Sequence, residues 1–261
     1  MDESEVDAMV ANNGYLTTFT EVDGSITNEI QQLSVSGLGD TLYLQNGGYV
    51  IIPGISLANG SIPDADGNVY TSVTIGTQEW MTENLRTTKY SDGTAIPNVT
   101  DNDEWSNLST GAWSHYDNDS SQYDATYGKL YNWYATSDSR NLCPTGWHVS
   151  TDFDWGVLTD YLGANGHNGT EGTALKATSG WNEYNGQRIN GTDDYGWNGL
   201  PGGRRKVDGS FYIRGYTGHW WSSSETYGSL AHPFNLNFNY GTVSKSGYYK
   251  EFGFSVRCLR D

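Results

Sequence analysis

The chain contains few of the residues that define several common protein classes. It has two cysteines and three methionines in 261 residues. This excludes a disulfide-rich scaffold, and no Cys-x-x-Cys or Cys/His spacing supports a zinc site. No run of 18 apolar residues occurs, so membrane insertion is not expected. Residues 1–13 are acidic where a signal peptide has a basic start and an apolar middle, so no signal peptide is predicted in this chain.

Basic residues are also scarce. Fourteen Lys and Arg are outnumbered by 31 Asp and Glu, which gives a formal net charge of −17. Such a surface repels a phosphate backbone, so nucleic acid is not expected as a partner. The five histidines are scattered, and no Ser/His/Asp or Cys/His spacing pairs a nucleophile with its base. We therefore expect a protein that is not an enzyme.

Glycine and aromatic residues are abundant instead. The chain has 33 Gly, 19 Tyr and 10 Trp, a composition that favours a loop-rich protein with much β-structure. Apolar spacing predicts two helices, one over Tyr127–Thr136 and one that begins after Ser150/Thr151 and runs to Leu162. Residues 100–126 are polar and are predicted to form a long surface loop. Of two adjacent tryptophans, Trp220 and Trp221, one is expected in the core and one exposed. The predicted fold class is α+β.

Residues 1–63 form a predicted N-terminal β-rich module. Short β-type runs occur at Leu33–Val35, Thr41–Leu44 and Tyr49–Ile52. Strands this few cannot bury a core, so we expect the module to gain stability by association, either as a homo-oligomer or attached to a larger particle. A flexible polar tether is the alternative. Residues 64–261 form the predicted main domain.

Residues 199–261 differ in composition from the rest. They hold eight of the 14 basic residues and four acids, a balance of +4 against −21 for residues 1–198. They also contain 13 of the 36 aromatic residues, which alternate with Asn, Ser, Thr, His and Gly. Large rigid rings beside small polar residues are typical of a binding surface. We therefore predict a ligand-binding surface in this region.

Two further patterns leave alternatives open. Cys143 precedes a strand-like run and Cys258 lies near the end of another, so a Cys143–Cys258 disulfide is favoured over two buried thiols. The acidic segments 64–68 and 117–124 alternate oxygen-bearing side chains but lack the distal Glu of a calcium loop. Turn formation is the favoured interpretation there, with a structural calcium ion as the lesser alternative. No metal site or cofactor is predicted.

The motifs from residue 64 onward resemble those of one bacterial family. They are Asp66-Gly-Asn-Val-Tyr70, Ile75-Gly-Thr-Gln-Glu-Trp-Met-Thr-Glu-Asn-Leu85, Tyr127-Gly-Lys-Leu-Tyr-Asn-Trp-Tyr-Ala135, Cys143-Pro-Thr-Gly-Trp-His-Val149, Leu200-Pro-Gly-Gly-Arg204, Trp220-Trp-Ser-Ser-Ser-Glu225 and Gly253-Phe-Ser-Val-Arg-Cys258. The resemblance is to the Fibrobacter succinogenes major paralogous domain. It implies a C-type-lectin-like domain of two helices, a twisted antiparallel sheet and long loops, and it implies no catalytic activity. The Glu-Pro-Asn, Gln-Pro-Asp and Trp-Asn-Asp triplets of calcium-dependent sugar binders are absent.

A narrower resemblance concerns the C-terminal region. Framework motifs there alternate with residues reachable from AAC-like codons, as in the variable proteins of diversity-generating retroelements. The predicted ligand-binding residues are Arg205, Tyr212, Arg214, Tyr216, His219, Tyr227, Ser229, His232, Phe234, Asn237, Asn239 and Tyr240. The resemblance implies a display protein that binds a protein or glycan receptor on a cell surface, itself located on a virion or outside a cell. The alternative is a carbohydrate-binding or adhesin module with a fixed ligand, which needs exposed rings such as Trp105, Trp113 or Trp181.

Overall fold

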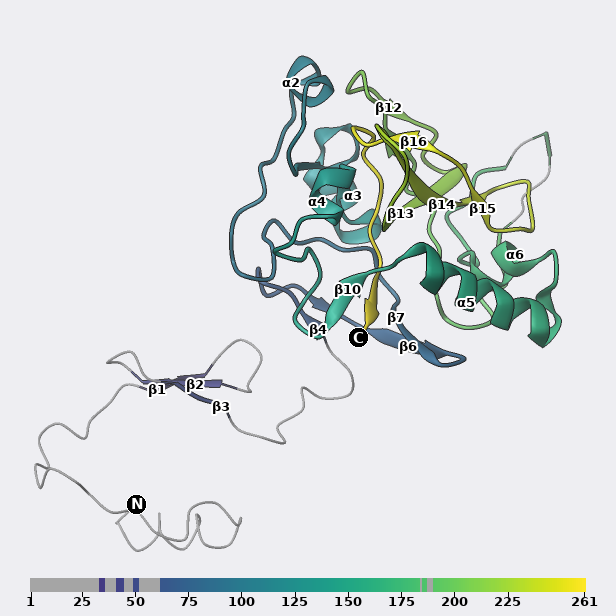
Figure 1. The fold of residues 1–261 in the computed structure, drawn as a ribbon. Helices are drawn as coiled ribbons and strands as arrows, with labels where there is room; N and C mark the ends of the chain where they lie inside the picture. Colours follow the sequence, from purple (N-terminus) through teal and green to yellow (C-terminus); the bar gives the residue numbers. More distant parts are fainter. Residues whose placement is uncertain (1–32, 36–40, 45–48, 52–61, 184, 187–189) are drawn as a thin grey trace, which may run out of the picture. The chain divides into compact units, whose positions relative to one another are not determined.

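A computed structural model of the chain describes residues 33–35, 41–44, 49–51, 62–183, 185–186 and 190–261. The chain divides into two units, Met1–Ile55 and Ser56–Asp261 (Figure 1). In the first unit, strands β1 (Leu33–Val35), β2 (Thr41–Leu44) and β3 (Tyr49–Ile51) form an antiparallel sheet with β2 in the middle. The three predicted strands are thus confirmed. The other residues of the N-terminal module, on which its predicted association also depends, lie outside the described part of the chain.

The second unit begins with a small hairpin. Strand β4 (Ile62–Pro63) pairs with β5 (Val69–Tyr70), and the turn between them includes Gly67, whose φ is +82°. The Asp64 carboxylate accepts hydrogen bonds from the backbone N–H groups of Asp66 and Asn68. The predicted turn is therefore present. Ile62 and Pro63, which the sequence placed in the N-terminal module, pair with the main domain.

The α+β class predicted from the sequence is confirmed. One antiparallel sheet has the order β10-β17-β7-β6, and a second has the order β13-β14-β15, with β16 also paired to β14. The first sheet consists of β6 (Ser72–Ile75), β7 (Gln78–Met81), β10 (Trp147–Val149) and β17 (Cys258–Arg260). The second consists of β13 (Thr217–Glu225), β14 (Leu230–Asn237), β15 (Ser244–Lys245) and β16 (Tyr248–Tyr249). Two further pairs are β8 (Trp113–Ser114) with β9 (Leu130–Tyr131), and β11 (Arg204–Arg205) with β12 (Phe211–Tyr212).

One of the two predicted helices is confirmed. Helix α5 (Asp152–Leu162) begins at a capping box in which Thr151 and Asp154 bond to each other's backbone N–H groups. Its buried residues include Trp155, Leu158 and Leu162, so the apolar spacing indicated the buried face correctly. The helix continues into the π-helical turn η2 (Gly163–His167), and helix α6 (Glu171–Leu175) follows.

The prediction for residues 100–136 is wrong. The supposed loop contains α2 (Asn102–Ser106), β8, the 3₁₀ turn η1 (Tyr116–Asn118) and α3 (Ser120–Tyr127). The supposed helix 127–136 is instead the end of α3, strand β9 and the short helix α4 (Trp133–Thr136). Asp101 and Asp119 cap α2 and α3 by accepting bonds from Glu104 N and Gln122 N. Residues that suggested a loop are thus N-caps of short helices.

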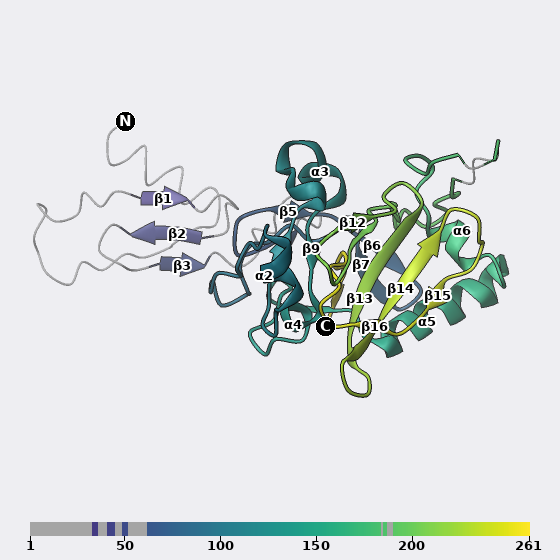
Figure 2. The same cartoon turned by 90° about the horizontal axis from the view of Figure 1, so that it is seen from above.

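The core lies on both sides of β13. Trp220 packs against Trp197, with ring centroids 4.9 Å apart, in the cluster that contains α5. Trp221 packs against Phe254 at 4.5 Å in the cluster on the α4 side. Figure 2 shows β13 and β14 between α5 and the segment that carries α2 and α4. Because helices cover both faces, both tryptophans are fully buried, and the prediction that one is exposed is wrong.

The favoured disulfide is present. Cys143 and Cys258 are bonded, with their Cα atoms 6.0 Å apart. The two strand-like runs pair as β10 and β17, with Val149 opposite Cys258. The bond thus joins the C-terminal strand to the segment that precedes β10.

Candidate ligand-binding surface

Nine of the twelve predicted ligand-binding residues are exposed or half-buried. Tyr227, at the turn between β13 and β14, is 98% exposed. The nine are Tyr212, Arg214, Tyr216, Tyr227, Ser229, His232, Asn237, Asn239 and Tyr240. Their side chains are accessible to a ligand.

The other three predicted residues are core residues, which corrects the prediction. Arg205 is fully buried, and its guanidinium donates to the main-chain oxygens of Val99, Thr100 and Gly209. His219 stacks on Phe254, with ring centroids 4.9 Å apart, and Phe234 stacks on Trp155 at 4.7 Å. The alternation of aromatic and polar residues could not reveal this burial, because the sheet is covered on both faces.

The nine accessible residues do not all lie on one side of the sheet. Asn237 is paired with Thr217 and lies on the side of His219 and Asn235. His232 lies on the opposite side, where its Nδ1 is 3.3 Å from Asp152 at the start of α5. Other members occupy the β13–β14 turn (Tyr227, Ser229) and the turn after β14 (Asn239, Tyr240). The structure therefore separates His232 from the surface that Asn237 belongs to.

A cluster around Arg204 lies on the Asn237 side of the sheet. We call it the Arg204 surface, and it comprises Arg204, Tyr212 and Tyr248, with the buried His219 ring in contact with Arg204. Arg204 is opposite Tyr212 in the β11–β12 pair, and the neighbouring residues Gly203 and Gly218 bridge β11 to β13. The Arg204 Nη1 donates to the Tyr248 hydroxyl at 2.8 Å and lies 3.4 Å from His219 Nε2. Strands distant in sequence thus bring these side chains together.

Aromatic rings surround the Arg204 guanidinium. Its Cζ lies 5.4 Å from the Tyr212 ring centroid, 5.3 Å from that of Tyr248 and 5.8 Å from that of Phe252. These distances are within the range of cation–π attraction. Within the described residues, no carboxylate lies within ion-pair distance of Arg204. Rings therefore surround the cation, and no residue in the described ranges supplies it with an anionic partner.

Three buried polar atoms of this region lack a hydrogen-bond partner in the described part of the chain. They are Arg204 Nε, His219 Nδ1 and Thr217 Oγ1. Burial, together with the Arg204 cation, lowers the pKa of His219 to about 3, so the ring is neutral at physiological pH. Because arginine can only donate, the Nε2 facing it is the acceptor and Nδ1 carries the proton. Unpaired buried donors of this kind are normally satisfied by water or by a ligand.

Arg214 and its neighbour have a different environment. The Arg214 guanidinium lies 4.7 Å from the Tyr123 ring centroid and 5.6 and 5.7 Å from those of Tyr116 and Tyr127. Ile213, between Tyr212 and Arg214, has a φ of +56°, which is rare for a β-branched residue. Backbone strain of this kind concentrates at binding sites.

Sequence reasoning did not include Arg204 and Tyr248 among the predicted ligand-binding residues. Adjacent strand residues face opposite sides, so only one of Arg204 and Arg205 can face the surface where the other side of the strand is covered. The sequence contains no signal for which one, since that depends on how β11 meets β13. Tyr248 belongs to the alternating aromatic and polar pattern, and that pattern was the available signal.

Comparison with known protein families identifies the family of this chain. The Fibrobacter succinogenes major domain matches residues 73–260. The chain belongs to this family. No curated protein and no solved structure matches the chain. The family domain extends from β6 to β17 and thus includes α5, the disulfide and the whole Arg204 surface.

The rings required by the carbohydrate-binding alternative are not exposed in this Fibrobacter succinogenes major domain. Trp105, Trp113 and Trp181 are all buried. The Trp105 indole donates to the Glu251 carbonyl, and the Trp113 indole donates to the Ile96 carbonyl. The expectation that these three rings stack on a sugar at the surface is therefore wrong.

In each acidic segment of the domain, a carboxylate is already bonded to donors of the domain itself. Asp64 accepts from Tyr70 OH at 2.6 Å in addition to two backbone N–H groups, and Asp124 lies 2.9 Å from Lys129 Nζ. Within the described ranges, no group of three or more His, Cys, Asp or Glu side chains is placed to hold a metal ion. No helix in those ranges is both long and apolar enough to span a bilayer.

Proposed function

We propose that this protein is a non-enzymatic binding protein that displays a C-terminal surface to a receptor on a cell surface. The observation that carries the proposal is the Arg204 surface, where an arginine without an anionic partner among the described residues lies among three aromatic rings. Arg and Tyr are enriched among the residues that dominate binding energies. Both are placed here on strands of a packed domain, which limits the entropy lost on binding.

A lectin-like, diversified surface is the form of this proposal that the sequence motifs favour. The α+β arrangement, with helices beside antiparallel sheets and long connections, is compatible with a C-type-lectin-like fold. The accessible residues include members of the turns at both ends of β14, and a buried side chain holds the backbone of the second of these turns. Lys176 Nζ donates to the main-chain oxygens of Asn237 and Tyr240. Side chains at such positions change without loss of these bonds, which is what retroelement diversification requires.

The proposed receptor is a protein or glycan, and the proposed location is a virion surface or the outside of a cell. A cell-binding assay with the full chain tests the function. We expect the wild type to bind target cells and Arg204→Ala/Tyr212→Ala/Tyr248→Ala to bind more than about tenfold more weakly, because hot-spot truncations typically exceed 1 kcal/mol. Phe153→Ala, which removes an exposed ring from α5, is the matched control and should bind as the wild type does.

Two results would overturn the proposal. One is a triple variant that remains folded and binds as tightly as the wild type. The other is a full chain that binds neither cells nor arrays of cell-surface proteins and glycans. Diversification has a separate genomic test, namely a neighbouring reverse-transcriptase gene with a near-copy of the last codons that differs at adenines. If the source genome contains neither, the surface is not diversified by a retroelement.

A further inference from the structure

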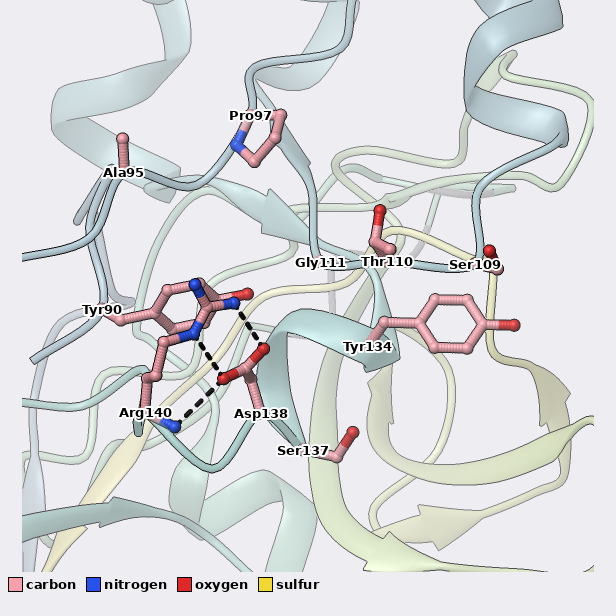
Figure 3. A pocket seen from close by; sticks show the side chains of 10 residues that line it. All are labelled: Tyr90, Ala95, Pro97, Ser109, Thr110, Gly111, Tyr134, Ser137, Asp138 and Arg140. Carbon is pink, nitrogen blue, oxygen red and sulfur yellow. Dashed lines mark hydrogen bonds and ion pairs between the residues drawn. The ribbon is translucent and has the colours of Figure 1, made fainter.

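A pocket lies in a part of the domain that the Arg204 surface does not include. Its volume is about 450 Å³, and its lining comes from residues 90–97, 109–111 and 134–140. Figure 3 shows these three segments around it. All lining residues precede residue 199, so the predicted diversified region contributes none of them.

One wall of the pocket is a stacked, charge-compensated group. The Arg140 guanidinium lies over the Tyr90 ring, 4.0 Å from its centroid. Arg140 Nε and Nη2 donate to the two oxygens of Asp138 at 2.8 and 2.7 Å. The hydrogen bonds from Arg140 lower the pKa of Asp138 to about 2, so the pair stays ionised above that pH. The wall is flat and polar, and its two charges cancel.

The other side of the pocket provides hydroxyl groups and a second ring. Ser109, Thr110 and Ser137 are exposed at its edge. The Tyr134 hydroxyl donates to Glu251 Oε1 at 3.0 Å, which fixes the ring. In Figure 3, Tyr90 and Arg140 line one side, and Tyr134 and Ser109 the other. The lining thus combines hydroxyl groups, the Asp138–Arg140 pair and the Tyr134 ring, and it carries no net charge.

A glycine makes room for the Tyr90 ring. A Cβ atom at residue 111 would lie 2.1 Å from the Tyr90 hydroxyl oxygen and 3.1 Å from the Ala135 Cα. Any other residue at this position would displace the tyrosine or α4. The shape of the pocket depends on this close approach.

We propose that this pocket binds a neutral sugar, as a free monosaccharide or as the terminal unit of a glycan. Its volume falls in the range of small-molecule sites, about 300–1,000 Å³. The hydroxyls match the donor and acceptor pattern of a sugar, and the half-buried Tyr134 ring and Pro97 offer apolar surface to its C–H faces. A phosphate or carboxylate ligand is disfavoured, because Asp138 already neutralises the arginine. The proposal does not depend on the Arg204 surface being a binding site.

Ligand-observed NMR on the full chain tests the proposal. The probes are glucose, galactose, mannose, fucose and N-acetylglucosamine, with N-acetylneuraminic acid as the acidic comparison. We expect at least one neutral sugar to bind and the acidic sugar to bind more weakly. Ser137→Trp should fill the pocket and weaken binding by more than about tenfold, which corresponds to 1.4 kcal/mol. Ser139→Trp is the matched control, because Ser139 is exposed in the same loop but does not line the pocket.

A second blocking variant distinguishes a filled pocket from a misfolded protein. Ser109→Trp fills the pocket from a different segment, and circular dichroism checks that each variant keeps its fold. The proposal fails if no neutral sugar binds, or if binding survives in a folded blocking variant. It also fails if Arg204→Ala abolishes sugar binding, since the sugar would then occupy the Arg204 surface. Loss of binding in both Ser137→Trp and Ser109→Trp, with Ser139→Trp and Arg204→Ala unchanged, supports it.

Discussion

Arg204 and Arg205 are adjacent in sequence but belong to regions with opposite roles. Arg205 lies in the buried framework, where its guanidinium bonds to main-chain oxygens of residues 99–101 and 209. Arg204 lies at the surface, among rings and without a carboxylate partner in the described residues. The same type of side chain thus fixes loops in one region and lies half-buried among aromatic rings in the other. The two arginines differ in their acceptors, because Arg205 faces several main-chain oxygens and Arg204 faces the Tyr248 hydroxyl.

The framework uses buried cations repeatedly in this way. Arg257 is fully buried, lies 4.0 Å from the Trp197 ring centroid and donates to the main-chain oxygens of Met81 and Trp197. Lys176 holds the turn after β14 in the same manner. These cations donate hydrogen bonds to buried main-chain carbonyls, so removal of any of them leaves several carbonyls without a donor.

Loss of the framework disulfide should have the largest effect. Cys143 and Cys258 are separated by 115 residues, and the chain-entropy model assigns a loop of about 100 residues roughly 4.7 kcal/mol. We expect Cys143→Ser/Cys258→Ser to lower the free energy of unfolding of the domain by about 4–5 kcal/mol. Guanidinium unfolding followed by tryptophan fluorescence measures it. A loss below about 1 kcal/mol would mean that the disulfide is not part of the stabilising framework.

The two adjacent arginines provide the most direct test of the comparison. Arg205→Met should destabilise the domain by about 3–5 kcal/mol, because several buried carbonyls each lose a donor at about 1–3 kcal/mol. Arg204→Met should change stability by no more than about 1 kcal/mol, since it removes one hydrogen bond to Tyr248. Thermal unfolding of the two variants side by side gives the difference. Equal losses would show that the two residues do not belong to different regions.

A fall in pH should destabilise the domain through His219, which is buried in the core and lies beside Arg204. Burial lowers its pKa to about 3 in the folded domain, against about 6.5 when unfolded. The unfolded chain therefore binds a proton first, and stability falls as the pH drops from about 6.5 towards 3. By pH 5 the free energy of unfolding should have fallen by about 2 kcal/mol from this cause. His219→Gln should remove that part of the pH dependence, and unfolding curves at pH 7 and pH 5 with an unchanged difference would contradict the assignment.

The smallest effect is expected at the exposed positions. Tyr212, Tyr227, Asn239 and Tyr240 are all exposed, so replacing all four with Ala should cost within about 0.5 kcal/mol for each residue. The melting temperature should then fall by only a few degrees. A quadruple variant that unfolds would place these residues in the framework and remove the distinction between the regions.

Local patterns in the sequence predicted the elements that depend on local physics. Thr151 and Asp154 mark the start of α5 because capping involves near neighbours, and the runs beside Cys143 and Cys258 indicated the strands that the disulfide joins. The burial of both Trp220 and Trp221 could not be predicted, because it depends on helices packed on each face of β13. The short helices capped by Asp101 and Asp119 were missed, since an aspartate-rich segment is equally typical of a loop.

The candidate sites were less predictable than the strands. Choosing Arg204 over Arg205 requires knowing which face of β11 meets β13, and no periodicity in a two-residue strand contains that information. The pocket combines Tyr90, Gly111 and Arg140 from three loops. Their proximity is a property of the fold and leaves no spacing pattern in the sequence.

The bonds from Lys176 have an evolutionary consequence. Its ammonium group contacts the carbonyl oxygens of Asn237 and Tyr240, and every amino acid carries that oxygen. A codon change at either position therefore leaves the anchor of the turn as it was, whichever residue it encodes. Selection for a new partner at these positions is separated from selection for folding, so most members of a randomised library at 237 and 240 should yield folded protein.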